Sequence, residues 1–255
     1  MVNERTNVLG VGISAINMEM ALEQLARWVA DRALQYVSIC TVHTVMECRR
    51  DEQLRRIVNE AGMTTPDGMP LVWLSRLAGR AHVSRVYGPD LMLAEMGASG
   101  ASGHSHFFFG GRAGVADRLA EAMRQRFPAI RIVGTVTPPV GSAQELCTAE
   151  TAARINEAHP DIVWVGVSSP KQEYWMSCMR AMLEAPVLIG VGAAFDFHTG
   201  TVRQAPRWIQ RAGLEWLFRL AHEPRRLWRR YLVDNPWFLW ELALQKLHLT
   251  HYEIH

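Results

Sequence analysis

The stretch Ile162–Leu183, IVWVGVSSPKQEYWMSCMRAML, decides the fold class. Its first part, Ile162–Val167, is apolar or small throughout and predicts a buried strand, while Lys171–Leu183 has a helical period. Because this unit recurs along the chain, we expect a parallel sheet covered by helices on both faces, an α/β fold. The other expected strands are 7–14, 36–41, 106–109, 130–134 and 187–192, and the other expected helices are 18–31, 42–60, 69–78, 89–98, 114–127 and 143–158, with a Gly/Ser-rich loop at 97–103.

The C-terminal part has a different character. After about residue 205 the expected strands stop and only helices remain, so we expect an α/β domain at 1–200 and a helical appendage at 201–255. Residues 203–230 hold eight arginines against two glutamates, and five of the nine tryptophans fall in 203–240. This concentration favours a surface for phosphates, acidic head groups or nucleic acid. A solvated helical face with core aromatics explains it equally well.

Length and composition exclude several classes of protein. The 255 residues are 49% hydrophobic and 20% charged, which excludes disordered and collagen-like chains. No apolar run approaches the roughly 18 residues of a membrane span. The first residues lack the apolar core of a signal peptide, so we expect a cytoplasmic protein. The cysteines at 40, 48, 147 and 178 form no C-x-x-C motif, so we expect no disulfide framework, zinc ribbon or iron–sulfur site.

The segment 224–244 has the pattern of a helix pair at a membrane surface. At about 100° per residue, the arginines of 225–232 fall on one half of a helix and its apolar residues on the other. We expect Asn235-Pro236 to break this helix and Trp237–Leu244 to form an apolar one after it. The alternative is an arginine face in solvent and an apolar face in the core. The nearly all-apolar second helix favours a membrane-surface role.

Two glycine-rich turns are candidate phosphate sites. Gly110 and Gly111 lie between an expected strand and an expected helix, where backbone N–H groups can approach a phosphate. A tight turn is the equal alternative. Both this turn and Gly190–Gly192 lack the G-x-G-x-x-G spacing, and no acidic ribose-binding residue follows Gly111 about 20 positions on. A dinucleotide site is therefore disfavoured.

Two further motifs carry reactive or charged side chains. Asp67 lies in a Pro-Asp-Gly turn, where its carboxylate could accept a proton from a substrate hydroxyl, although local sequence favours a helix N-cap. Lys171 and Gln172 follow a strand end, where open α/β sheets bind ligands, and could meet a phosphate or a base edge. A capped surface helix is the alternative there. The chain has no D-x-D, no Walker A lysine and no G-x-S-x-G, and its scattered histidines predict no metal site.

Eight motifs in order together resemble the WecG/TagA/CpsF glycosyltransferase family along nearly the whole chain. The resemblance implies a Rossmann-like α/β body whose basic C-terminal appendage closes over the active site at the membrane. It also implies transfer of a sugar from a UDP-sugar to a polyprenyl-pyrophosphate-linked acceptor, with inversion and without metal or other cofactor, in bacterial cell-surface polysaccharide synthesis. The matching motifs are Thr65–Met69, Ser84–Leu91, Phe108–Gly111, Ser169–Glu173, Gly190–Asp196, Gly200–Pro206, Gly213–Arg219 and Glu223–Arg226.

The resemblance also implies roles for single residues. Asp67 becomes the expected general base, and Thr41 fits the Thr of a Thr-x-Asn motif in which His43 replaces the Asn. Gln204 stands where an Arg often precedes Ala-Pro, so the identity of the donor sugar, UDP-N-acetylmannosamine-type or UDP-glucose-type, stays open. The expected ligands of the nucleotide are Gly110, Gly111, Lys171 and Gln172, and those of the sugar are Thr41, His43 and Asp90. Four arginines of the appendage are expected to hold either UDP or the acceptor pyrophosphate: Arg219, Arg225, Arg226 and Arg229.

Two other function classes compete with this one. An NAD-dependent oxidoreductase is disfavoured by the missing ribose acid, and a nucleic-acid-binding protein is disfavoured by the apolar segment 237–244, which offers nothing to a polyanion. We expect a protein bound peripherally to the inner face of the cell membrane through its C-terminal helices. Their exposed apolar residues also predict self-association into a homo-oligomer where membrane is absent.

Overall fold

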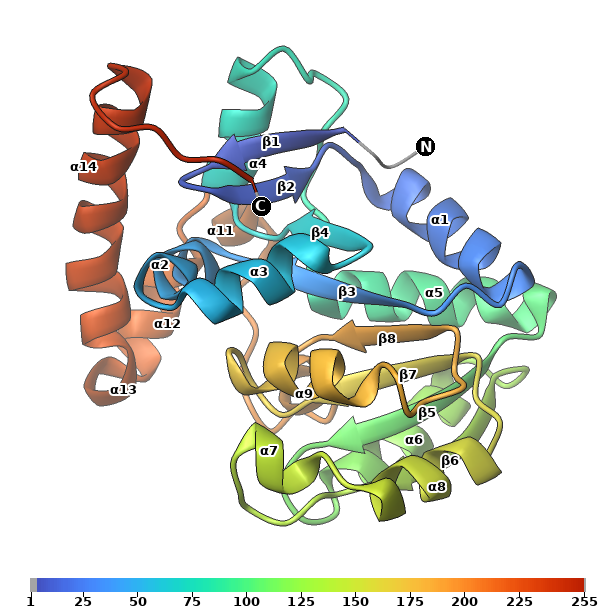
Figure 1. Cartoon of the computed structure of the whole chain (residues 1–255). Coiled ribbons are helices and arrows are strands. Elements are labelled where there is room, and N and C mark those ends of the chain that lie inside the picture. The colour runs from blue at the N-terminus through green and yellow to red at the C-terminus, as the bar shows by residue number, and fades with distance from the viewer. Residues whose placement is uncertain (1–3, 255) are drawn as a thin grey trace.

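A single parallel sheet forms the centre of the molecule. The computed structural model describes residues 4–254 (Figure 1). Six strands follow the order β4-β3-β8-β7-β5-β6, and each neighbouring pair is parallel. The expected α/β, Rossmann-like fold is thereby confirmed. The strands are β3 (Gln35–Cys40), β4 (Met63–Pro66), β5 (Ser105–Gly110), β6 (Arg131–Val136), β7 (Ile162–Gly166) and β8 (Val187–Gly190).

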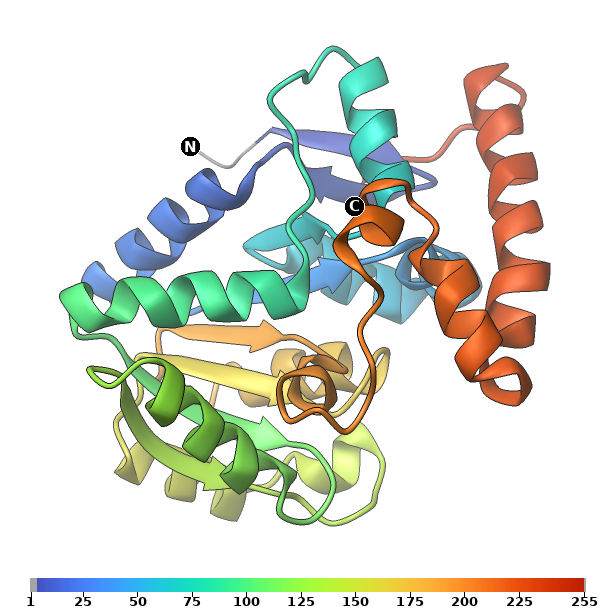
Figure 2. The ribbon, with the colours of Figure 1, turned by 180° about the vertical axis from the view of Figure 1, so that it is seen from behind.

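Helices cover both faces of this sheet because its strands are apolar on both sides. Phe108 and Trp164 belong to the core under one helical layer, and their neighbours Phe109 and Val165 belong to the core under the other. Figures 1 and 2 show the two layers from opposite sides. The first layer is α1 (Met18–Ala30), α5 (Gly88–Ser102) and α6 (Val115–Arg126); the second is α3 (Glu52–Glu60), α7 (Ala143–Leu146), α8 (Ala149–Glu157) and α9 (Lys171–Met179).

A third core joins the two ends of the chain. The antiparallel hairpin β1 (Arg5–Val8) and β2 (Val11–Ser14) packs with α2 (Val42–Arg50), α4 (Met69–Leu77) and the C-terminal helix α14 (Asp234–Lys246). Phe238 brings α14 into this core. The backbone N–H of Leu9 also donates to Gln245 Oε1 at 3.1 Å, and Asn7 Nδ2 donates to the carbonyl of Tyr252 at 2.6 Å. The C-terminal helices are thus packed against the N-terminal hairpin.

Residues 194–246 contain helices only, as expected. They are α10 (Ala194–His198), α11 (Arg207–Arg211), α12 (Glu215–His222), α13 (Pro224–Trp228), the π turn η1 (Arg229–Val233) and α14. Figure 2 shows the orange segment crossing from the sheet to α12 and then to α14 at the side of the molecule. Within residues 4–254 no helix is long and apolar enough to cross a membrane. The division into domains at residue 200 stays a prediction.

Several expected element boundaries are wrong, for local reasons. The expected strand 7–14 is a hairpin, because Leu9 and Gly10 turn the chain with positive φ angles of 53° and 86°. The expected helix 42–60 divides at Asp51, whose side chain caps α3 through the N–H of Leu54. Residues 97–102 continue α5, which ends at Gly103 with φ 76°, and are not a loop. Residues 63–66, which we assigned to no strand, form β4.

The expected helix break at Asn235-Pro236 is also wrong. Pro236 lies in the first turn of α14, where a missing N–H is tolerated, and η1 connects α13 to α14. A π turn carries an extra residue and shifts the faces of the helix that follows it. The apolar residues of this segment do not share one environment: Leu227 and Tyr231 are buried, whereas Trp228 and Leu232 are exposed.

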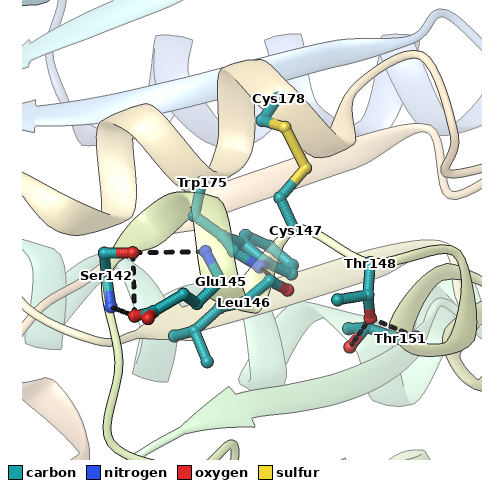
Figure 3. Close-up of a disulfide and its surroundings, with 8 residues drawn as sticks. All are labelled: Ser142, Glu145, Leu146, Cys147, Thr148, Thr151, Trp175 and Cys178. Carbon is teal, nitrogen blue, oxygen red and sulfur yellow. Dashed lines mark hydrogen bonds between the residues drawn. A yellow bond between two sulfur atoms is a disulfide. The ribbon is translucent and has the colours of Figure 1, made fainter.

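One expectation about the cysteines is contradicted. Cys147 at the end of α7 forms a disulfide with Cys178 of α9 (Figure 3). Trp175 Nε1 donates to the carbonyl of Leu146 at 3.1 Å beside it. Spacing along the sequence could not reveal this pair, because packing of α7 on α9 brings together residues 31 positions apart. Cys40 and Cys48 are free and buried.

Candidate active site

A polar cavity of about 300 Å³ opens at the carboxyl ends of β3, β7 and β8. These ends are where ligands bind in open α/β sheets. The appendage closes the cavity from the other side with three arginines. Its lining includes Thr41, His43, Asp67, Tyr87, Ser168, Ser169, Gln172, Gly192, Phe197, Arg219, Arg226 and Arg230.

A second, more apolar cavity of about 300 Å³ adjoins the first. It lies between the start of α4 and the appendage elements α12, η1 and α14. Its apolar lining includes Met69, Pro70, Trp216, Tyr231, Phe238 and Leu239. Six residues line both cavities and so form the wall between them: Thr41, His43, Asp67, Tyr87, Arg219 and Arg230.

Asp67 lies between the two cavities because it directly follows the edge strand of the sheet. It follows β4 directly, its backbone N–H donates to the carbonyl of Cys40 at 3.0 Å, and it is 8% exposed. The N-cap of α4 is Gly68, so the helix-cap alternative for Asp67 is wrong. Its carboxylate instead accepts from Arg85, with Nη2 at 3.0 Å and Nε at 3.3 Å from Oδ1.

Burial and charge act in opposite directions on Asp67. Burial raises the pKa of its carboxyl to about 6, although Arg85 opposes the rise. Glu215 of α12 adds to it. A carboxylate of this pKa is ionised near neutral pH and still accepts a proton readily.

Arg85 is a site residue that sequence reasoning missed. Its guanidinium contacts Asp67 from the body and both Gln210 and Glu215 from the appendage, and its carbon Cζ lies 4.0 Å from the ring centre of Tyr87. Arg85 lies within the matching motif Ser84–Leu91, but only Asp90 of that motif was predicted to be a site residue. Asp90 itself lies outside both cavity linings and pairs with Arg207 at 3.1 Å.

Thr41 and His43 enter the site from the start of α2. Thr41 caps this helix, since its Oγ1 accepts from the N–H of Thr44 at 3.3 Å. Burial, with help from Arg230, lowers the pKa of His43 to about 4. The imidazole is therefore neutral near pH 7 and can either donate or accept a hydrogen bond at each nitrogen according to its tautomer.

The surroundings of His43 contain a set of potential metal ligands. His43, Glu47 and Asp234 offer ligand atoms within 4.8 Å of one another. Arg50 Nη1 binds Glu47 at 2.8 Å, and Arg50 Nη2 binds Asp234. The guanidinium of Arg50 therefore already supplies Glu47 and Asp234 with the positive charge that a metal ion would bring.

The residues expected to bind the nucleotide separate into two groups. Gln172 lines the polar cavity, where its Oε1 accepts from the N–H of Gly192 at 2.9 Å. Lys171 lies outside both linings and donates to the carbonyl of Gly141 at 3.0 Å. Gly110 and Gly111 also lie outside them. At Gly110, with φ 135°, a Cβ would lie 2.6 Å from the backbone of Gly166, so close strand packing explains this glycine.

The appendage arginines also separate. Arg219 and Arg226 line the polar cavity, while Arg225 and Arg229 are exposed and lie outside both linings. Arg230, which sequence reasoning did not select, lines both cavities, and burial lowers its pKa. The buried Nε atoms of Arg219 and Arg230 have no hydrogen-bond partner among the described residues. Buried donors of this kind normally have a partner, so their arrangement suits an anionic ligand.

Comparison with known proteins finds relatives of one kind. The sequence profile described as "Glycosyl transferase WecG/TagA/CpsF family" matches residues 6–252. An N-acetylglucosaminyldiphosphoundecaprenol N-acetyl-beta-D-mannosaminyltransferase of Bacillus spizizenii (strain ATCC 23059 / NRRL B-14472 / W23) is 31% identical over 186 residues, which cover 73% of this chain and 70% of that protein. The Bacillus subtilis (strain 168) protein of the same name is 30% identical over 203 residues, covering 80% and 77%.

Proposed function

The chain belongs to the WecG/TagA/CpsF family of glycosyl transferases, and on that premise we propose that it transfers a sugar from a UDP-sugar to a polyprenyl-pyrophosphate-linked acceptor. The product enters a bacterial cell-surface polysaccharide. Both relatives are named N-acetylmannosaminyltransferases, so UDP-N-acetylmannosamine is the first donor to test and UDP-glucose the second.

The polar cavity is the proposed site of the donor. The observation that carries this assignment is that Arg219 and Arg230 both line this cavity beside Asp67, while the buried Nε atom of each lacks a hydrogen-bond partner among residues 4–254. A diphosphate supplies the acceptor oxygens that such donors need. Arg226 and Gln172 complete the proposed lining.

The apolar cavity is the proposed site of the acceptor sugar. Trp216 and Tyr231 offer aromatic faces that suit a pyranose ring, and Asp67 stands at the wall toward the donor. An acceptor hydroxyl in this cavity can reach Asp67 from the side opposite the departing UDP. That arrangement supports inversion at the anomeric carbon.

In the proposed reaction Asp67 takes the proton of the acceptor hydroxyl while that oxygen attacks the anomeric carbon. The bond from that carbon to UDP breaks, and its electron pair leaves with the diphosphate. A general base contributes roughly 10²–10⁴-fold to such a step. Arg219, Arg226 and Arg230 would balance the charge that develops on UDP, as fixed cations do in preorganised sites. We propose that they do so without a metal ion.

The outer surface of the appendage is the proposed membrane contact. Trp228, Leu232 and Trp240 are exposed there, and Arg225 and Arg229 are exposed nearby in the sequence. Apolar side chains with neighbouring cations favour an interface with anionic lipid. We place the protein on the inner face of the cell membrane by this argument, and expect the same apolar surface to promote homo-oligomers where membrane is absent.

Release of UDP tests the proposal. The assay takes a panel of UDP-sugars in EDTA, with and without a polyprenyl-pyrophosphate-linked N-acetylglucosamine. We expect release from one donor only when the acceptor is present. Acceptor-independent release, a requirement for added divalent metal, or no release from any donor would each contradict part of the proposal.

A further inference from the structure

Arg85 is shared between two carboxylates that belong to different parts of the molecule. Its Nη2 lies 3.0 Å from Asp67 Oδ1 and 2.6 Å from Glu215 Oε2. Asp67 follows the edge strand β4 directly, and Glu215 begins α12 of the appendage. The hydroxyl of Tyr87 donates to the other oxygen of Glu215 at 3.1 Å. One guanidinium therefore connects the proposed base to the appendage.

Because Arg85 is shared, it lowers the proton affinity of Asp67 less than it would if it bound Asp67 alone. A carboxylate that has an arginine to itself keeps a low proton affinity. Glu215 draws on the same guanidinium and adds a negative charge near Asp67, and its charge is one of the causes of the raised pKa of Asp67. If α11 and α12 left the body together, Arg85 would lose its contacts with Gln210 and Glu215 and retain those with Asp67.

The other groups around Asp67 do not duplicate the effect of Glu215. His43 is neutral near pH 7, because burial lowers its pKa to about 4. Arg219 acts on Asp67 in the opposite direction, as Arg85 does. The remaining titratable groups near Asp67 are Cys40 of β3, Tyr87, whose pKa burial raises, and Arg230 of η1.

We propose that Glu215 is a positioning residue that shares the guanidinium of Arg85 with Asp67 and so maintains Asp67 as an effective base only while α12 is docked on the body. The inference rests on the proposed function, because it takes Asp67 as the general base. It makes proton transfer conditional on the closed position of the appendage.

The chain offers a matched control in Glu241 of α14. Glu215 and Glu241 are both on the appendage, and the side chain of each is 14% exposed. Each accepts from one arginine and one tyrosine hydroxyl, which for Glu241 are Arg49 at 3.3 Å and Tyr252 at 2.5 Å. Glu241 accepts in addition from Trp237 Nε1 at 3.0 Å. Glu241 lines neither cavity. A purely structural role in docking the appendage would therefore affect both glutamates alike.

The experiment compares pH profiles of kcat/KM for the full-length wild type, Glu215→Gln and Glu241→Gln with one UDP-sugar and the lipid-linked acceptor. We expect the acidic limb of Glu215→Gln to move to lower pH by about one unit, and its rate at the alkaline plateau to fall, because Arg85 then pairs with Asp67 alone. Glu241→Gln should keep the limb at the wild-type pH.

Each outcome decides the inference. The inference is overturned if the acidic limb of the Glu215→Gln profile stays at the wild-type pH. It is also overturned if the acidic limb of Glu241→Gln moves by the same amount as that of Glu215→Gln. If Glu215→Gln melts below the assay temperature, Glu215→Asp is tested in its place. This variant keeps the negative charge, so its acidic limb should remain at the wild-type pH. Movement of that limb to lower pH overturns the inference. Failure of the wild type to release UDP from any donor would count against the proposed function, whereas an active wild type with an unmoved limb counts against this inference alone.

Discussion

Asp67 combines deep burial with a direct ion pair, two properties that act in opposite directions on its pKa. Arg85 alone would hold its pKa low, but burial outweighs the ion pair and raises the pKa to about 6. A buried acid with a raised pKa beside a cavity is a frequent property of catalytic groups. The chemistry we propose depends on this balance at a single residue.

The activity should depend on pH in a defined direction. Asp67 must be ionised to accept a proton, so kcat/KM should rise as pH increases and reach half of its plateau near pH 6, the pKa of Asp67. Initial rates of UDP release between pH 4.5 and 8.5, at constant ionic strength of about 0.15 M, give the profile. A profile without an inflection between about pH 5 and 7 would contradict the assignment.

Arg230 should contribute strongly to binding of UDP. Its buried Nε lacks a partner among the described residues, and charge-assisted hydrogen bonds contribute about 1.5–3 kcal/mol. Arg230→Gln should therefore raise the Kd for UDP by roughly 10- to 100-fold in calorimetric titration. Arg211→Gln is the matched control, because Arg211 is an exposed arginine of the appendage outside both cavities. Equal losses in both variants would argue for a general electrostatic effect.

At the scale of elements, the sequence predicts strands and helices where their hydrophobic pattern is strong. Five of the six expected strands correspond to strands of the central sheet, and the sixth is the hairpin. The missed strand β4 is only four residues long, MTTP, and contains no alternating pattern. Its position at the sheet edge depends on pairing with β3, which no local signal reveals. Asp67 follows that strand directly, so the sequence identified the residue but not its placement.

At the site too, local sequence identifies candidate residues, whereas tertiary packing decides which of them reach the cavities. Thr41, His43, Asp67, Gln172, Arg219 and Arg226 were predicted and do line the cavities. Arg230 was missed because only the packing of η1 decides that Arg230 lines the cavities and its neighbour Arg229 does not. Gly110, Gly111, Lys171, Asp90, Arg225 and Arg229 belong to matching motifs, yet they lie outside the linings. A motif selects a neighbourhood, and only packing decides which of its side chains face the cavity.

The docking of α14 can be tested through one side chain. Phe238 is 2% exposed in the core shared with the hairpin, and loss of a buried phenylalanine costs about 3–5 kcal/mol. Phe238→Ala should lower the melting temperature by at least about 5 °C in circular dichroism. Leu247→Ala, at a residue that is 67% exposed near the end of the same helix, should change it by less than about 2 °C. Similar effects of both substitutions would contradict the packing.

At the scale of the whole molecule, the two ends of the chain meet around the site. The N-terminal hairpin and α14 share a core, and in Figure 1 the red C-terminal segment lies beside the blue hairpin. The appendage supplies arginines to the polar cavity and aromatic residues to the apolar one. Both cavities are therefore complete only when the appendage is docked on the body.

The proposed membrane contact predicts binding to anionic vesicles. Trp240 is 64% exposed on α14, and burial of a large apolar side chain contributes about 1.5–3 kcal/mol. Trp240→Ala should reduce the vesicle-bound fraction in a flotation assay with an affinity loss of about tenfold. Leu34→Ala is the control, because Leu34 is 51% exposed just before β3, at the opposite end of the strands from the cavities. Binding that is insensitive to Trp240, or equally sensitive to Leu34, would contradict the proposed orientation.

The central claim is that Asp67 accepts the proton of the acceptor hydroxyl. The most direct test measures acceptor-dependent UDP release in EDTA for the wild type and Asp67→Asn, together with UDP affinity in calorimetric titration. We predict that Asp67→Asn loses at least about 100-fold in turnover and retains UDP binding, because the amide preserves the shape of the site but cannot take the proton. Turnover close to that of the wild type would contradict the claim.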